Sequence, residues 1–142
     1  MSRRLAREQV FTLLFQIDFT DSFEEGTEQI ERYLAQYPDI ESLDTNFILE
    51  ELEGIRQHQD KIDTTLEKYS EGWKVTRMGK VDRAILRLAV YEIFYATDIP
   101  VSVSINEAVE LAKKFGEDSS PSFINAVLGK IVQQESLDGY DE

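Results

Sequence analysis

Three arginines stand together at the start of the chain, at Arg3, Arg4 and Arg7. At about 100° per residue they share one face of a helix, and Phe11 and Phe15 continue that side, away from the apolar stripe. Guanidinium groups pair with phosphates and aromatic rings stack on bases, so this combination favours a nucleic-acid contact. The alternative is a solvated helix start without a ligand. Cations at a helix N-terminus oppose the helix dipole, which points weakly to another use for them.

A second candidate site surrounds a predicted helix start within residues 116–123. Ser119 and Ser122 adjoin backbone N–H groups that a helix start leaves without partners, and such groups suit a phosphate or a ribose. Phe123 lies off the core stripe that Ile124 defines, so its ring is available to a base. Ordinary core packing of Phe123 is the alternative.

A third candidate site is the basic segment from Trp73 to Arg87. Asp82 stands among its cations, and the interpretation that needs no ligand is a local salt bridge, which at a surface contributes under about 1 kcal/mol. Trp73 is interpreted as a core or loop anchor. The cations of this segment are Lys74, Arg77, Lys80, Arg83 and Arg87.

Catalytic patterns are missing from the sequence. There is no cysteine, and the single histidine, His58, has no nucleophile nearby and is interpreted as a boundary residue. The closely spaced glutamates between residues 24 and 31 have no Glu-x-x-His pair and are interpreted as a solvated acidic face. No glycine-rich phosphate loop is present. We therefore expect neither an enzyme nor a metal or cofactor site.

Length and charge narrow the class further. The chain has 142 residues, the size of one domain, and a net charge of −13, which argues against a general nucleic-acid binder. Two basic islands interrupt the acidic body, with a net charge of +2 in residues 1–17 and +3 in residues 73–97. No signal peptide or membrane span is visible, so we expect a cytoplasmic protein.

The periodicity predicts an all-α fold, a compact bundle of about seven helices in a single domain covering residues 1–134, followed by an acidic, frayed tail at 135–142. A nearly all-round apolar helix beginning at Val81 must lie in the middle of the bundle. A capping box at Ser104 and Glu107 predicts the start of the next helix, and Gly116 its end. The other predicted helices cover about 2–19, with Ser2 as a cap, and 27–36, then one from Asp44 or Thr45, one after His58, and one from Ser120-Pro121.

Several separated stretches resemble the NusB family, the bacterial transcription antitermination factors. They are RRLAREQVFTLLFQ, VDRAILRLAVYEI, IPVSVSINEAVELAKKFG and SPSFINAVLGK, in order over residues 3 to about 132. The resemblance implies that Arg3, Arg4, Arg7 and Phe123 contact boxA RNA, with Ser119 and Ser122 at the same site, and that Asp82 and Phe15 contact a partner protein. Many members have Asp where Ser119 stands and Lys where Ser122 stands, which leaves open which residue reads the base edge.

The resemblance also implies a function. The family works as an adaptor that pairs with Nus factor E, a small-subunit ribosomal protein. The pair binds single-stranded boxA RNA in ribosomal RNA leaders and supports a processive RNA polymerase antitermination complex. One rival is an RNA-modifying enzyme, since NusB-like domains also occur fused ahead of RNA methyltransferases. Another is a protein-interaction module without direct RNA contact, and a homodimer is a further open alternative.

Overall fold

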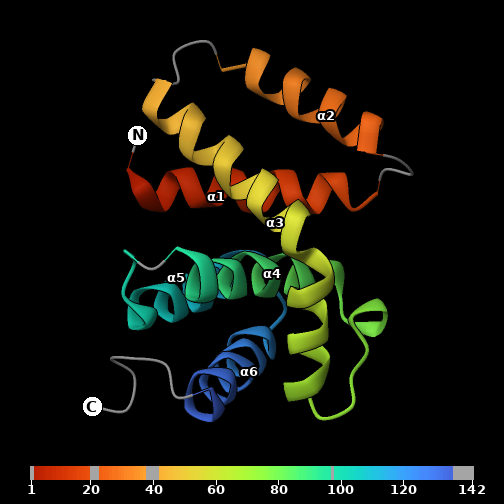
Figure 1. The fold of residues 1–142 in the computed structure, drawn as a ribbon, viewed down its shortest axis with the longest axis vertical. Coiled ribbons are helices and arrows are strands. Elements are labelled where there is room, and N and C mark those ends of the chain that lie inside the picture. Colours follow the sequence, from red (N-terminus) through yellow and green to blue (C-terminus); the bar gives the residue numbers. More distant parts are fainter. Residues whose placement is uncertain (1, 20–22, 38–41, 97, 136–142) are drawn as a thin grey trace. The chain divides into compact units, whose positions relative to one another are not determined.

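The computed structural model describes residues 2–19, 23–37, 42–96 and 98–135 (Figure 1). Within these ranges it contains six α-helices, one short 3-10 helix and no strand, which confirms the predicted all-α class. The acidic tail predicted at 135–142 lies outside the described residues except for Glu135, the C-cap of the last helix. The elements are α1 (Arg3–Ile17), α2 (Phe23–Ala35), α3 (Ser42–Tyr69), η1 (Val75–Arg77), α4 (Lys80–Tyr95), α5 (Val101–Phe115) and α6 (Ser120–Gln134).

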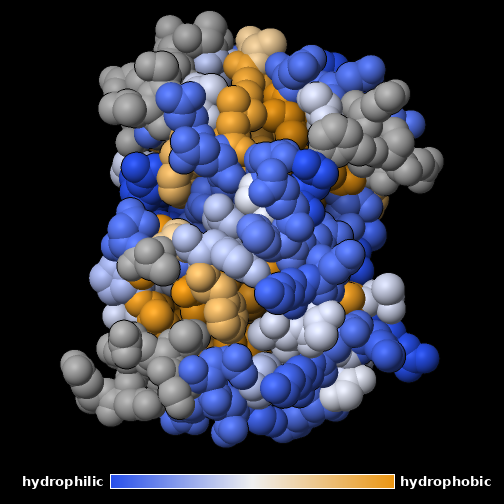
Figure 2. Space-filling model, viewed as in Figure 1, coloured by the Kyte–Doolittle hydropathy of each residue, from blue (hydrophilic) through white to orange (hydrophobic). Residues whose placement is uncertain are grey.

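The helices form two compact units, Met1–Gly54 and Ile55–Glu142, and the long helix α3 passes through the boundary. Hydrophilic side chains cover most of the face drawn in Figure 2, as the net charge of −13 leads one to expect. Hydrophobic residues gather there in a patch over α2 and α3 in the first unit and in another over α5 in the second (Figure 2). No helix in the described part of the chain is long and apolar enough to cross a membrane.

In the first unit, α1 packs against α2 and buries one apolar stripe. Val10 and Leu13 are fully buried, as the spacing predicts, because residues three apart lie on the same face of a helix. The predicted cap is confirmed: Ser2 Oγ accepts a hydrogen bond from the Leu5 backbone N–H at 3.1 Å. This bond satisfies one of the donors at the helix start and fixes where the arginines of α1 begin.

Three predicted helix boundaries in the first half of the chain are wrong. Helix α3 is continuous from Ser42 to Tyr69, with no break after His58, and Asp44 lies in its first turn instead of capping it. Neither proline nor glycine occurs between residues 55 and 69, and Ile55 and Ile62 continue one buried stripe across the expected break. Helix α2 begins at Phe23 and not near residue 27 as predicted, so residues 23–26 are helical.

In the second unit, α4 is the central helix, as predicted, and packs against both α5 and α6. Its buried residues lie around most of the helix, so apolar neighbours cover it on several sides. They include Ala84, Ile85, Leu86, Leu88, Ala89, Val90 and Ile93.

The start of α5 differs from the predicted capping box. The helix begins at Val101 after Pro100, whose carbonyl accepts bonds from the Val103 and Ser104 N–H groups. Ser104 therefore lies inside the helix, where its side chain is buried and its Oγ has no hydrogen-bond partner among the described residues. The fixed φ of proline favours a helix start directly after it, and this signal prevailed over the Ser-x-x-Glu spacing.

Candidate RNA-binding and partner-binding surfaces

The first two arginines of α1 lie at the surface. Arg3 and Arg4 are exposed in the first turn of the helix, which carries no acidic residue. The Arg3 guanidinium stacks on the Phe47 ring of α3, with 3.9 Å between its central carbon and the ring centroid. A stacked guanidinium keeps its in-plane N–H groups directed outward, where they can bond to phosphate oxygens. The contact also orders the side chain in advance, which lowers the entropic cost of binding an anion.

Arg7 and Phe11 are placed differently from the sequence prediction. Arg7 is 6% exposed and Phe11 is 4% exposed, so both belong to the interior and not to a continuous outer face. The prediction that Phe11 lies away from the core is therefore wrong. The physical reason is that two helices, α2 and α3, follow α1 in the same unit, so α1 buries more than one narrow stripe.

The start of α6 is built around a close approach to the end of α5. Gly116 caps α5 as predicted, and a Cβ on this glycine would lie 2.6 Å from Ser120 Cβ. The Ser120 Oγ in turn accepts a hydrogen bond from the Glu117 backbone N–H at 3.0 Å. Helix α6 begins at Ser120, one residue earlier than predicted, because its N-cap is Ser119 and not Ser120; Pro121 lies in the first turn.

The predicted site residues at the start of α6 differ in their exposure to solvent. Ser119 and Ser122 are exposed, Phe123 is half-buried, and Ile124 is fully buried in the core. Half-burial leaves part of Phe123 at the surface, in the same turn of chain as the two exposed serines. The arrangement can accept a sugar or a base edge at a helix N-terminus. The exposed carboxylates of Glu117 and Asp118 lie just before it and disfavour a phosphate there.

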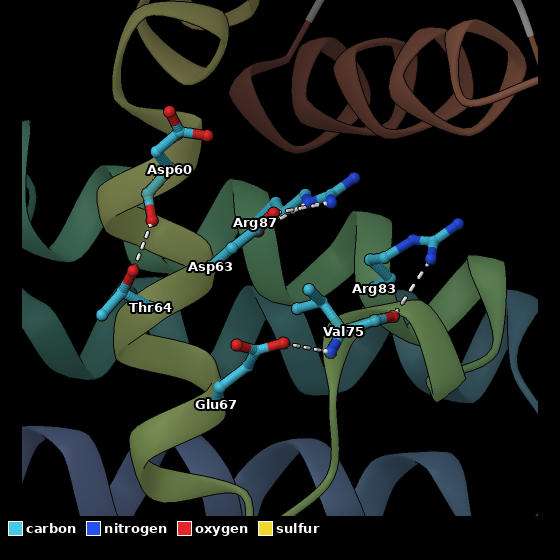
Figure 3. Close-up of polar contacts among 7 residues, drawn as sticks. All are labelled: Asp60, Asp63, Thr64, Glu67, Val75, Arg83 and Arg87. Carbon is cyan, nitrogen blue, oxygen red and sulfur yellow. Dashed lines mark hydrogen bonds and ion pairs between the residues drawn. The ribbon is translucent and has the colours of Figure 1, made fainter.

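The basic segment of the second unit is divided between internal and outward cations. Arg83 is buried, and its Nη1 donates to the Val75 carbonyl oxygen at 3.0 Å (Figure 3). Arg87 makes a two-fold pair with Asp63 of α3, with both N–O distances at 2.9 Å. The sequence analysis treated all cations of residues 73–97 as one basic island. This is wrong for Arg83 and Arg87, because their side chains bond to other parts of the second unit.

Asp82, the candidate partner contact, lies in the first turn of α4 and is half-buried. Its Oδ1 is shielded from solvent and accepts no hydrogen bond from any described residue, so the alternative of a local salt bridge finds no support at that atom. Phe15, the other candidate, is half-buried in α1 of the first unit. Its ring lies edge-on to Phe19, with centroids 5.2 Å apart, and Phe19 is 61% exposed.

Trp73 does not belong to the core, which was one of the two roles expected of it. This residue is 53% exposed on the turn between α3 and α4. Lys74 and Arg77 beside it are also exposed. The run of charged and small residues around Trp73 was the available signal, since little apolar sequence surrounds it. His58 fits its prediction as a boundary residue: it is half-buried and stacked on Tyr95, with ring centroids 3.9 Å apart.

No cluster of metal-ligating side chains occurs in the described part of the chain.

The family model for NusB matches residues 4–133. The transcription antitermination protein NusB of Acetivibrio thermocellus is 47% identical over 98% of this chain and 95% of its own length. The chain belongs to the NusB family. Its fold agrees with T. maritima NusB at a TM-score of 0.83 and 33% identity, over 94% of this chain and 92% of that one.

NusB membership makes this chain a transcription antitermination factor and not an enzyme. It also confirms the resemblance inferred from the separated sequence stretches. A further structural relative is a complex of the antitermination factors NusB and NusE with double-stranded RNA. It has a TM-score of 0.76 at 24% identity, covers 93% of this chain and 96% of that one, and shows likeness of fold.

Proposed function

We propose that this NusB-family protein is an RNA-binding adaptor for boxA, a single-stranded element of ribosomal RNA leaders. Arg3 and Arg4 bind phosphates at the start of α1, and Ser119, Ser122 and Phe123 supply sugar and base contacts at the start of α6. The observation that carries the proposal is the exposed, pre-ordered Arg3 guanidinium stacked on Phe47, within a chain whose net charge is −13.

Arg7 enters the proposal in a different role from its neighbours. Because it is 6% exposed, it supports the helix that carries the outer arginines more than it reaches a phosphate. Replacing Arg7 would therefore mix a loss of packing with any loss of RNA binding. The sharper variant leaves Arg7 in place.

The partner in this proposal is Nus factor E, which binds at Phe15 and Asp82. The support for this assignment is the family resemblance together with the position of Asp82, half-buried in the first turn of α4. The structural relative that contains NusB and NusE with double-stranded RNA supports a combination of RNA and NusE as ligands, without bearing on the single-stranded form. Each ligand tethers the other near its site, so joint binding raises the affinity for both. The resulting complex acts on RNA polymerase in the cytoplasm and favours processive transcription of ribosomal RNA operons.

Fluorescence anisotropy with a labelled boxA-like RNA tests the proposal. The arms are a scrambled single strand and a boxA duplex, each with and without Nus factor E. The test variant is Arg3→Ala/Arg4→Ala, and the control Arg32→Ala/Lys61→Ala removes the same charge from exposed positions elsewhere. Losing two phosphate contacts on a single strand should flatten the slope of log K against log salt by about 1.4, since each contact contributes about 0.7.

The two rival functions predict different results. If the partner complex binds boxA and the Arg3→Ala/Arg4→Ala variant keeps both the affinity and the salt slope, the arginines have no RNA role. The chain is then a protein-interaction module. Preference for the duplex over the single strand would overturn the single-stranded substrate while leaving RNA binding in place.

A further inference from the structure

The turn between α3 and α4 holds an exposed tryptophan in a fixed position. Trp73 is 53% exposed, yet its backbone is tied to Ser70 by two bonds. The Trp73 N–H donates to the Ser70 carbonyl at 3.2 Å, and the Ser70 hydroxyl donates to the Trp73 carbonyl at 2.8 Å. Ser70 itself is 2% exposed, so the anchor of the turn lies in the interior.

Val75, two residues after Trp73, is held from both flanking helices (Figure 3). The Val75 N–H donates to Glu67 Oε2 of α3 at 2.9 Å, and the Val75 carbonyl accepts from Arg83 Nη1 of α4 at 3.0 Å. Val75 and Met78 are both 7% exposed and fix the turn to the second unit. The exposed indole is therefore presented by a rigid support and is not a side effect of a loose loop.

The chemistry around the indole favours a protein as its ligand. Tryptophan and arginine are the side chains most enriched at the energetic centres of protein interfaces, and Arg77 accompanies Trp73 on this turn. Glu71, also on the turn, is exposed and would oppose a continuous chain of phosphates. A protein surface can place separate charges opposite Glu71, Lys74 and Arg77, which a phosphate backbone cannot do.

The turn is also continuous with the proposed partner surface. Only Met78 and Gly79 separate η1 from α4, whose first turn carries Asp82. Arg83, the residue after Asp82, reaches back to the turn through its bond to Val75. The geometry points to Trp73 as the central anchor of the surface that binds the partner protein, inserted into an apolar pocket bordered by carboxylates that face Lys74 and Arg77. This inference rests on the proposed partner role of Asp82.

Trp73 is the only tryptophan of the chain, so labelling with 5-fluorotryptophan gives a protein with a single fluorine site. We expect its ¹⁹F resonance to shift or broaden when unlabelled Nus factor E is added, and to stay unchanged with boxA-like RNA alone. The Trp73→Ala variant should bind the partner more than tenfold more weakly, as measured by calorimetry. The control Tyr95→Ala, at the opposite end of α4, should stay within twofold of wild type.

A second variant separates binding from folding. Lys74→Glu/Arg77→Glu keeps the indole and should weaken partner binding most at low salt, because its effect is electrostatic. Circular dichroism and thermal unfolding of all variants check that the fold is intact.

If the partner binds wild type and Trp73→Ala equally and the resonance does not move, the inference is overturned while the proposed adaptor function stands. A resonance that moves with RNA alone overturns it in favour of an RNA surface. No binding of the partner to wild type overturns both proposals.

Discussion

Replacing Gly116 with alanine tests how the α5–α6 junction is built. The Gly116 N–H donates to the Ala112 carbonyl at 2.9 Å, closing the last turn of α5. A methyl group on Gly116 would lie 2.6 Å from both Cβ and Oγ of Ser120 and 2.8 Å from the Ala112 carbonyl oxygen. The φ of Gly116 is −92°, which alanine adopts readily, so backbone strain does not contribute to the outcome.

Two opposing terms set the sign of the change. Replacing glycine with alanine at a compatible position stabilises a protein by about 0.4–1 kcal/mol through the unfolded state. Forcing an extra methyl into a packed site costs about 1–3 kcal/mol. Because one of the contacted atoms is backbone and another is a Cβ fixed on a helix, neither can move aside cheaply. We therefore expect Gly116→Ala to lower the free energy of unfolding by about 1–2 kcal/mol.

Urea titration and thermal unfolding measure this loss. For 142 residues the unfolding entropy near the midpoint is about 0.3 kcal/mol/K, so the expected fall in Tm is about 3–7 °C. Gly79→Ala is the matched control, since nothing lies within 4 Å of its added Cβ, and it should stay within about 0.5 kcal/mol of wild type. A Gly116→Ala variant as stable as wild type, or more stable, would refute the argument that the two helices meet too closely for a methyl group.

Two further substitutions test the interactions within each unit, one in the first and one in the second. Burial raises the pKa of Tyr33 to about 12, and the neighbouring Tyr37 adds to this effect. Because an unfolded tyrosine ionises near pH 10, the stability contributed by neutral Tyr33 is complete below that pH and is lost as pH rises through about 12. Urea unfolding at pH 9 and 11.5 should show a smaller loss for Tyr33→Phe than for wild type, and parallel losses would contradict this. In the second unit, Asp63→Asn should cost about 1–3 kcal/mol, because it leaves the largely buried Arg87 without its carboxylate. The exposed Asp60→Asn on the same helix is the control, and equal losses for the two variants would contradict a structural role of the ion pair.

Much of the fold is predictable because the apolar periodicity is strong. The central helix α4, the end of α5 at Gly116 and the start of α6 near Ser120 all follow from local patterns that tertiary packing reinforces. The continuity of α3 past His58 does not, because a polar stretch within a long helix is indistinguishable from a turn until the burial of flanking apolar residues is known. The start of α5 was missed because two valid start signals competed, and Pro100 prevailed over Ser104.

In the candidate site, too, the sequence predicts the exposure of some residues and not of others. Helical spacing correctly places Arg3 and Arg4 together at the start of α1, but it does not say how wide the buried face of that helix is. For this reason Arg7 and Phe11 were expected at the surface and are found in the interior. The exposure of Trp73 was missed for the opposite reason: large aromatic side chains are buried more often than not, and only the structure shows this one at the surface.

The division of the basic residues also bears on how the adaptor works. Net charge by segment counts every cation, yet Arg83 and Arg87 bond to a carbonyl and a carboxylate inside the second unit. The positive charge at the surface is therefore smaller than the sequence total, and at the start of α1 it is supplied mainly by Arg3 and Arg4. Under the proposed function, two arginines in a chain of net charge −13 would bind RNA only weakly and in a salt-sensitive way. A partner that holds the RNA nearby raises its effective concentration at this site, so tight and selective binding is expected of the pair and not of this chain alone.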